Sequence, residues 1–379
     1  MSLQVGSKIT VVYLLYNAER TVAALVDSIR AQRHPDHASQ ADWLEVIFMD
    51  DCSRDATAAR LDAALQAAGR PAHFRVVRNE KNLGLSATLN KAFSLVRTPL
   101  VLTCHCDCFY GTPEYVATMA RLLETNPRVG AITGQPALPA PDQRASIPTA
   151  EKINLISNLM DIFPSEPPAP GVELVPVGFA EGRCDAFRME ALARVGFYDT
   201  GLRVAGEYQV LASRMRAEGY EVCQAPRLAY ELRVSDEQDT VTKLMRHEFK
   251  FGKVHPYILF LHSGTSSGVV GSRAGGNRQA RTLLRAVQIL CTFGYFWPFV
   301  GWALGLDWTI CLAPLFFAKL AKGALFRRHL AEIPLRFREW IQLSLAQPLL
   351  DVSYTVGLAA GFVLLFQIRR AGAQAGPIT

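Results

Sequence analysis

The chain has 379 residues, of which 50% are hydrophobic and 20% charged, and its formal net charge is +6. This length excludes a single small module and allows one large domain with an appendage, or two domains. The positive charge gathers in residues 243–285 and 319–338, which suits a phosphate ligand or an anionic membrane surface, and we expect no nucleic-acid partner.

The first residues, MSLQVGSKIT, contain no apolar segment behind a basic start. We therefore expect no secretory signal and place the N-terminal part in the cytosol, where thiols stay reduced. The eight cysteines lie mostly within apolar runs. We interpret them as small buried hydrophobic residues and not as a disulfide framework: Cys52, Cys104, Cys106, Cys108, Cys184, Cys223, Cys291 and Cys311.

Apolar runs typical of strands alternate with helical patterns over the first hundred residues. Strands are predicted at 9–16, 44–50, 73–79 and 99–104, and helices at 19–32, 55–68 and 85–96. Because the strands are almost continuously apolar, this alternation predicts an α/β fold, a mostly parallel sheet with helices on both faces. A further helix is predicted at 112–129, a short strand at 130–134, and a loop at 137–170 with one helical piece at 149–162.

Polar residues follow three of the predicted strands at the points where they end. Ligands of such sheets bind at the carboxyl ends of the strands, so we expect a binding site formed by these residues: Tyr16, Asn17, Asp50, Asp51, His105 and Asp107.

The third of these strand ends, 101-VLTCHCDC-108, suggests a metal site. Residues two apart on an extended strand point to the same side, so His105 and Asp107 are expected to project together, away from Cys104, Cys106 and Cys108. One carboxylate and one imidazole form a partial ligand set for a divalent cation. A zinc site built from the three thiols is the competing interpretation, but no second pair of ligands follows at a suitable spacing.

From about residue 283 the sequence changes to long apolar segments. Three of them are candidate membrane spans, 286–304, 309–326 and 349–368, with buried core helices of a soluble protein as the alternative. Residues 334–347 and 243–253 mix apolar with basic side chains, as interfacial helices do, although ordinary amphipathic surface helices are commoner. Three spans from a cytosolic domain leave Arg369 and Arg370 outside, against the positive-inside tendency, so a re-entrant middle hairpin is a second topology.

Five segments resemble, in their order and spacing, the family 2 glycosyltransferases of GT-A (Rossmann-like) fold. They are 10-TVVYLLYNAERTVAALVDSIRAQ-32, 45-EVIFMDDCSRDAT-57, 78-RNEKNLGLSATLNKAF-93, 101-VLTCHCDC-108 and 182-GRCDAFRMEALARVGFYD-199. The resemblance covers roughly residues 8–230. It departs from the family at two positions. His105 stands where the family usually has the first carboxylate of the metal strand, and Gly206-Glu207 stand where the family usually has Glu-Asp ahead of a helix.

The resemblance implies roles for individual residues. Glu207 aligns with the catalytic base, which deprotonates the acceptor and inverts the anomeric carbon, and Asp107 with His105 is implied to hold a divalent cation, Mn²⁺ or Mg²⁺. Asp50 and Asp51 have a structural alternative, which is to cap the helix that begins near 53–55. The structural alternative for Glu207 is a carboxylate that interacts favourably with the dipole at the start of a helix. The implied donor-binding residues are Tyr16, Asn17, Glu19, Asp50, Asp51, Asn82, Gly84 and Arg183.

The apolar segments add an acceptor to this prediction. We expect an inverting, metal-dependent enzyme of the inner (plasma) membrane, multi-pass with its catalytic domain cytosolic, that transfers one sugar per event from a UDP-, GDP- or dTDP-sugar. Its acceptor is expected to be a polyprenyl-phosphate or polyprenyl-diphosphate lipid for bacterial surface polysaccharide, contacted by Arg246, His247 and Lys250. The expected regions are 1–235 (GT-A), 236–285 (basic, interfacial) and 286–379 (transmembrane). A catalytically weakened homologue acting as a membrane scaffold is the alternative.

Overall fold

The computed structural model describes residues 8–138, 141–157, 170–180, 182–202, 206–233, 240–261 and 276–371. Its first half is a parallel α/β unit, as the alternating pattern predicts. The strands β1 to β4 lie in the order β3-β2-β1-β4, with a helix in each connection. Their bounds are β1 (Ile9–Leu15), α1 (Val22–Arg30), β2 (Leu44–Asp50), α2 (Thr57–Ala67), β3 (Phe74–Arg78), α3 (Leu85–Phe93) and β4 (Leu100–His105).

The second half continues the same sheet with mixed strand directions. β8 pairs antiparallel with both β4 and β6, while β9 runs parallel to β6 and antiparallel to β5 and β7. The elements are β5 (Cys108–Tyr110), α4 (Tyr115–Thr125), β6 (Val129–Ala137), α5 (Thr149–Ser157), β7 (Val175–Pro176), β8 (Cys184–Arg188), α6 (Met189–Arg194), α7 (Glu207–Ala217) and β9 (Glu221–Leu232). The sheet, expected to be mostly parallel, is therefore parallel from β3 to β4 and mixed beyond β4, where, among the described strands, only β6 and β9 pair in parallel.

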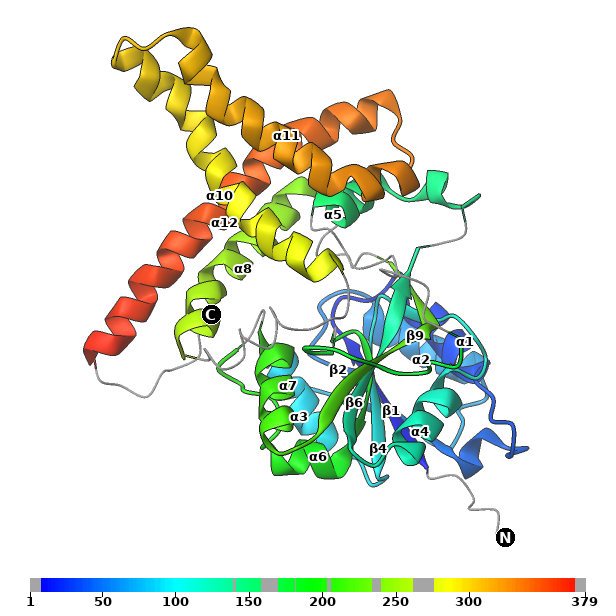
Figure 1. The fold of residues 1–379 in the computed structure, drawn as a ribbon. Helices are drawn as coiled ribbons and strands as arrows, with labels where there is room; N and C mark the ends of the chain where they lie inside the picture. Colours follow the sequence, from blue (N-terminus) through cyan, green and yellow to red (C-terminus); the bar gives the residue numbers. More distant parts are fainter. Residues whose placement is uncertain are drawn as a thin grey trace.

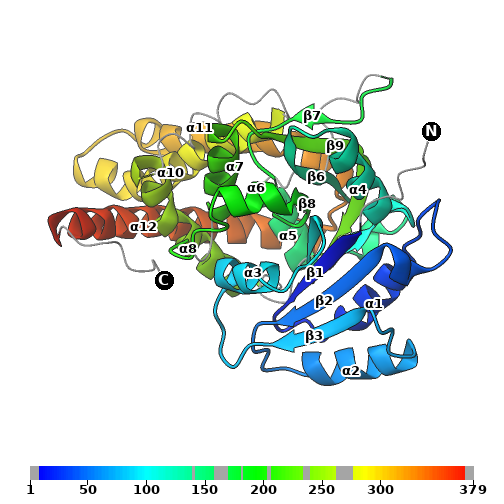
Figure 2. The same cartoon turned by 90° about the horizontal axis from the view of Figure 1, so that it is seen from below.

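Helices cover both faces of the sheet, which explains the near-continuous apolar runs of its strands. Along β1, Val11 and Tyr13 enter one core with α1, α2 and α4, whereas Val12 and Leu14 enter the other with α3, α6 and α7. Figure 2 shows these two layers on opposite sides of the strands.

The C-terminal region consists of long helices beside this domain: α8 (Val241–Leu261), α10 (Gly276–Ala303), α11 (Trp308–Glu332) and α12 (Phe337–Ala371). α10 and α11 form a hairpin that projects from the domain, and α8 runs along α12 (Figure 1). Within the part of the chain that the structure describes, three segments are long and apolar enough to cross a membrane: Leu283–Ala303, Trp308–Glu332 and Phe337–Phe366. The expected interfacial segment 334–347 and the third expected span are one helix, which continues through Pro348 because Ala346 and Leu350 on either side are buried.

Buried polar contacts attach α12 to the α/β domain. The Lys152 Nζ of α5 lies 3.0 Å from Glu339 Oε2 and donates to the carbonyl of Pro334 at 2.9 Å. The Gln347 Nε2 donates to the Ser157 Oγ at 2.6 Å. The turn between α11 and α12 is thereby held against the domain.

Candidate functional site

The carboxyl ends of β2, β1 and β4 lie side by side at one edge of the sheet. Register places Leu15 of β1 beside Asp50 of β2, and Leu14 beside His105 of β4. The residues that follow these strands therefore gather at one edge, as the sequence predicts, because parallel strands end together.

Asp50 and Asp51 are buried, and protein groups occupy both carboxylates. Asp50 Oδ1 accepts from the amide and hydroxyl of Ser53 at 2.9 and 2.5 Å, and its Oδ2 lies 3.2 Å from Arg78 Nε. The carboxylate at the start of α2 is instead Asp55, whose Oδ1 accepts from the Thr57 amide at 3.0 Å. Asp50 therefore does not cap α2, and instead its carboxylate holds the loop that precedes this helix.

Asp51 fixes the loop that leads into α3. Its Oδ1 accepts from Asn79 Nδ2 and from the Leu83 amide, both at 2.8 Å, and its Oδ2 accepts from the Gly84 amide at 2.9 Å. Gly84 therefore lies at the edge through Asp51, whereas the neighbouring Asn82 is exposed. Asp51 thus shapes this rim of the site.

The loop after β1 is tied to the loop after β2. Asn17 Oδ1 accepts from the Arg54 amide at 3.0 Å, and Glu19 Oε2 accepts from the Ala56 amide at 3.1 Å. Tyr16, between β1 and Asn17, is half-buried. Asn17 and Glu19 thus position the two loops, a role that composition alone does not reveal.

The end of β4 differs from the expected extended strand. β4 ends at His105 and a turn follows, so Asp107 lies in that turn, and the alternation of side chains along a strand does not extend to it. His105 Nε2 is 3.1 Å from the Tyr208 hydroxyl, and its amide donates to the Arg183 carbonyl at 2.9 Å. The Arg183 guanidinium lies 3.9 Å from Asp107 Oδ2.

Electrostatics favours a neutral imidazole at His105. Burial and the Arg183 cation lower its pKa, and the nearby Asp107 carboxylate opposes them only in part. A neutral imidazole can ligate a metal ion, whereas a protonated one cannot. Cys104 and Cys108 are buried in the apolar core, and in the described ranges no three His, Cys, Asp or Glu side chains gather as metal ligands.

Glu207 is the first residue of α7 and is buried, with 3% of its surface exposed. Gly206, at φ +88°, makes the left-handed turn that leads into the helix. Glu207 Oε2 has no hydrogen-bond partner within the part of the chain that the structure describes. Burial raises the pKa of Glu207 to about 7. A carboxyl group with this pKa can exchange a proton near neutral pH.

Tyr208, which follows Glu207 on α7, contacts one of the metal-ligand candidates, and no sequence pattern predicts this contact. Its hydroxyl meets His105, and a Cβ on Gly182 would lie 2.1 Å from its ring. Only glycine fits at position 182, where φ is +79°, so the turn that carries Arg183 packs directly on Tyr208. The only available signal was its position next to Glu207.

The three expected acceptor contacts separate on α8. Arg246 and Lys250 are exposed one helical turn apart. His247 is half-buried, with Nδ1 3.9 Å from Glu248 Oε1 and its ring stacked on Phe251. His247 therefore belongs to the packing of α8, while Arg246 and Lys250 face outward.

The comparisons with known proteins agree with this fold. Residues 10–194 match the family described as Glycosyl transferase family 2, and no curated protein matches the chain significantly. The mannosyltransferase PcManGT from Pyrobaculum calidifontis, solved with GDP-Man and Mn²⁺, has a TM-score of 0.53 at 15% identity and covers 93% of this chain and 88% of its own. GalNAc-T7, solved with UDP, GalNAc and Mn²⁺, has a TM-score of 0.49 at 14% identity over 70% of this chain and 55% of its own.

The family match includes the edge residues from Tyr16 to Arg183, and Glu207 and the C-terminal helices lie beyond it. The likeness to PcManGT shows a common fold. Residues 10–194 are therefore similar to the family 2 glycosyl transferases, and they lie within a sheet of GT-A type.

Proposed function

We propose that the protein is an inverting glycosyltransferase that moves a sugar from a nucleotide-sugar onto a lipid-linked acceptor at the cytosolic face of the inner (plasma) membrane. The observation that carries the proposal is Glu207, a buried carboxyl group whose Oε2 has no hydrogen-bond partner among the described residues, and which precedes Tyr208, the residue that contacts His105. A burial-raised pKa of about 7 suits a base that removes the proton of an attacking hydroxyl.

The donor would lie along the carboxyl edge of β1, β2 and β4. Asp51 and Asn17 shape the loops of this edge, and Tyr16 and Arg183 offer a ring and a cation to the nucleotide and its phosphates. The solved mannosyltransferase of this fold binds GDP-Man with Mn²⁺, which supports a nucleotide-sugar and a divalent cation here.

The metal-ligand candidates fit a cation that is shared with the donor. Asp107 supplies a carboxylate and His105 a neutral imidazole, and the oxygens of a diphosphate with water would complete the set. The cation would neutralise charge on the leaving diphosphate. Arg183, 3.9 Å from Asp107, would contribute positive charge to the same phosphates.

The membrane part of the proposal rests on the three candidate spans and on the exposed cations of α8. The spans carry many exposed apolar side chains, among them Phe293, Phe299, Trp302 and Phe316. Soluble proteins rarely expose apolar surface on this scale. A lipid-linked acceptor, a polyprenyl phosphate or diphosphate used for surface polysaccharide, would reach the site from this surface.

Sugar transfer by membranes that contain the full-length protein tests this function. Labelled UDP-, GDP- and dTDP-sugars are supplied in turn with a bacterial lipid extract, and we expect label to enter the lipid phase from one of them. Glu207→Gln should abolish this transfer, and the product linkage should be inverted relative to the donor. Absence of transfer from every donor, or undiminished transfer by Glu207→Gln, would refute the proposal.

A further inference from the structure

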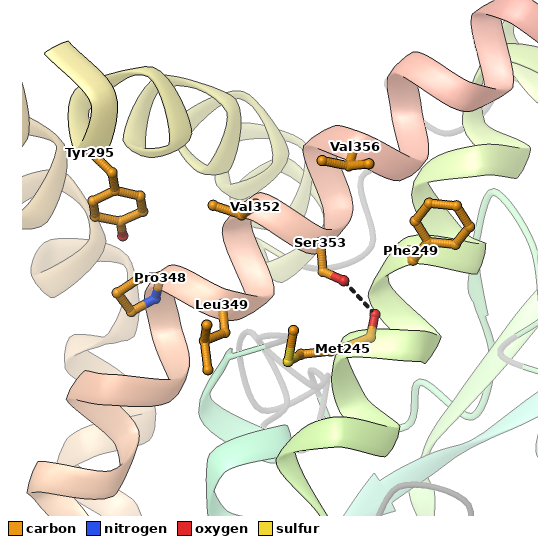
Figure 3. A pocket seen from close by; sticks show the side chains of 8 residues that line it. All are labelled: Met245, Phe249, Tyr295, Pro348, Leu349, Val352, Ser353 and Val356. Carbon is orange, nitrogen blue, oxygen red and sulfur yellow. Dashed lines mark hydrogen bonds between the residues drawn. The ribbon is translucent and has the colours of Figure 1, made fainter. Parts of the chain in front are cut away.

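An apolar groove lies between α8 and two helices that carry candidate membrane spans, α10 and α12. It has a volume of about 350 Å³ and is lined by Met245 and Phe249 of α8, Tyr295 of α10, and Leu349, Val352 and Val356 of α12 (Figure 3). Its two polar side chains have partners: the Ser353 hydroxyl donates to the Met245 carbonyl at 2.7 Å, and the Tyr295 hydroxyl donates to Asp351 Oδ2 at 2.8 Å.

A neighbouring groove reaches α5 of the α/β domain. This second groove, of about 370 Å³, shares Leu349 with the first and is bounded by Ile153 of α5 and Val241 at the start of α8. Eight residues before Val241, the Arg233 amide donates to the Asp107 carbonyl at 2.8 Å. The second groove is thus bounded by a residue that lies eight positions along the chain from a contact of Asp107.

A second connection leads to the proposed base. Val254 of α8 packs with Leu202 and with Val210, which lies one turn beyond Glu207 on α7, and Phe251 packs against this cluster. α8 therefore lies between the helix that carries Glu207 and the groove.

Two exposed cations flank lining residues of the groove along α8. Arg246 and Lys250 follow the lining residues Met245 and Phe249 in the sequence and are exposed. Among the described residues neither of these cations has an ion-pair partner. An apolar channel with two exposed cations next to its lining residues complements a molecule with a phosphate on a hydrocarbon chain.

We infer that this groove holds the hydrocarbon chain of the lipid phosphate acceptor, with its phosphate at Arg246 and Lys250 and its head directed toward Glu207. The inference rests on the proposed function and adds the acceptor's binding site to it. Bulk membrane phospholipid is the competing occupant, and the experiment separates the two.

The experiment labels the purified full-length protein with a farnesyl phosphate that carries a diazirine on its chain. After illumination, mass spectrometry should find the label on groove residues. Val356→Trp should fill the groove and reduce labelling at least tenfold. Val363→Trp is the matched control, because Val363 lies on the same helix, is similarly exposed (59% against 51%) and does not line the groove, so labelling should stay within twofold.

Competition identifies the occupant. Unlabelled farnesyl phosphate should displace the probe, whereas phosphatidylglycerol at the same concentration should not. Replacing both Arg246 and Lys250 with Gln should weaken farnesyl phosphate at least tenfold and leave farnesol unchanged. Equal displacement by phosphatidylglycerol, or unchanged labelling in Val356→Trp, would overturn the inference.

Binding of a nucleoside diphosphate to the same preparation separates this inference from the proposed function. If the groove is labelled specifically but the protein binds no nucleotide, the proposed transferase function is contradicted and the inferred lipid site is supported. Nucleotide binding with no groove labelling would do the reverse.

Discussion

Glu207 combines a functional and an energetic consequence in one side chain. Its pKa of about 7 in the folded protein exceeds the usual carboxyl value, so ionisation disfavours the folded state. The contribution of Glu207 to the free energy of unfolding is fully present below the pKa that this side chain has in the unfolded chain. It is lost as pH rises through 7, by about 3 kcal/mol in all. As the proposed base, Glu207 would have to be ionised to act, and it would therefore lower the stability of the fold at the pH where it acts.

Glu207→Gln should accordingly lose transfer by roughly two to four orders of magnitude and gain stability above pH 7. The measurement is the transfer rate together with the apparent Tm in detergent from pH 5 to 9. The gain in Tm should vanish toward pH 5, where the wild-type carboxyl is protonated. Glu218→Gln, an exposed change at the end of the same helix, should alter neither. A pH-independent Tm difference would contradict this account of Glu207.

Asp51 is expected to act through the loop that it holds. Asp51→Ala removes three hydrogen bonds and leaves Asn79 buried with a lost partner, which should cost about 2 to 4 kcal/mol and weaken nucleotide binding. Asp62→Ala, which removes an exposed ion pair with Arg70, should cost less than about 1 kcal/mol. Thermal unfolding and nucleotide titration of both variants measure this. Equal, small effects would show that Asp51 does not order the rim.

The sequence indicated most of these residues by type but not by contact. Asp51, Asp107 and Glu207 follow from the resemblance to a family, and the edge follows from strand order. The meeting of His105 with Tyr208 joins residues 103 positions apart, and no local pattern encodes it. The turn at Asp107 was also missed, because a strand end and a turn share the same polar composition.

At the scale of elements, α5 and α12 are joined by a buried ion pair. Lys152→Met should leave the Glu339 carboxylate without its cation and lower stability by about 3 to 5 kcal/mol. The double variant with Glu339→Leu should recover much of this loss, because no uncompensated charge is then left. A double-mutant cycle on the apparent Tm measures the coupling. Additive losses would show that the pair does not join the two helices.

α8 and α12 approach closely at glycines. A Cβ on Gly357 would lie 2.1 Å from the Phe249 carbonyl oxygen, and one on Gly252 would lie 2.2 Å from that of Tyr354. Gly357→Ala should therefore separate the helices and lower the apparent Tm. Gly323→Ala on α11, where a Cβ meets nothing within 4 Å, should be neutral or slightly stabilising. Equal Tm values for the two variants would contradict the close packing.

Elements were predictable where their periodicity was strong. β1, β2, β3, β4 and β6 lie within a few residues of the predicted runs, as do α1 to α5. β5 and β7 are two or three residues long and carry no periodic signal, and β9 contains Pro226 and a register shift opposite β6. The length of α12 was missed, because 334–347 and 349–368 were expected as separate segments, whereas one helix that packs with α5 and α8 includes both Phe337 and Ile368.

For the whole molecule, the length of α12 limits how it can sit in a bilayer. Its 35 residues span roughly 50 Å, more than the roughly 30 Å hydrocarbon core. The part before Pro348, held by Lys152 of α5, would then lie outside the core, beside the α/β domain. This fits the expected interfacial position of 334–347 and places the turn between α11 and α12 on the side of the domain.

Membrane integration gives a direct prediction for the full chain. An alkaline carbonate wash should leave the protein in the membrane pellet, because spans are held by apolar burial and not by charge. Release into the supernatant by this wash would contradict the three spans, and release by high salt alone would indicate a surface-bound protein.

The central claim is a nucleotide-sugar site at the carboxyl edge of the sheet. Calorimetric titration of the detergent-purified protein with UDP, GDP and dTDP, in Mn²⁺, Mg²⁺ or EDTA, tests it most directly, with Asp107→Ala alongside. We predict cation-dependent binding of one nucleotide, lost in Asp107→Ala. Absence of binding under every condition would contradict the claim.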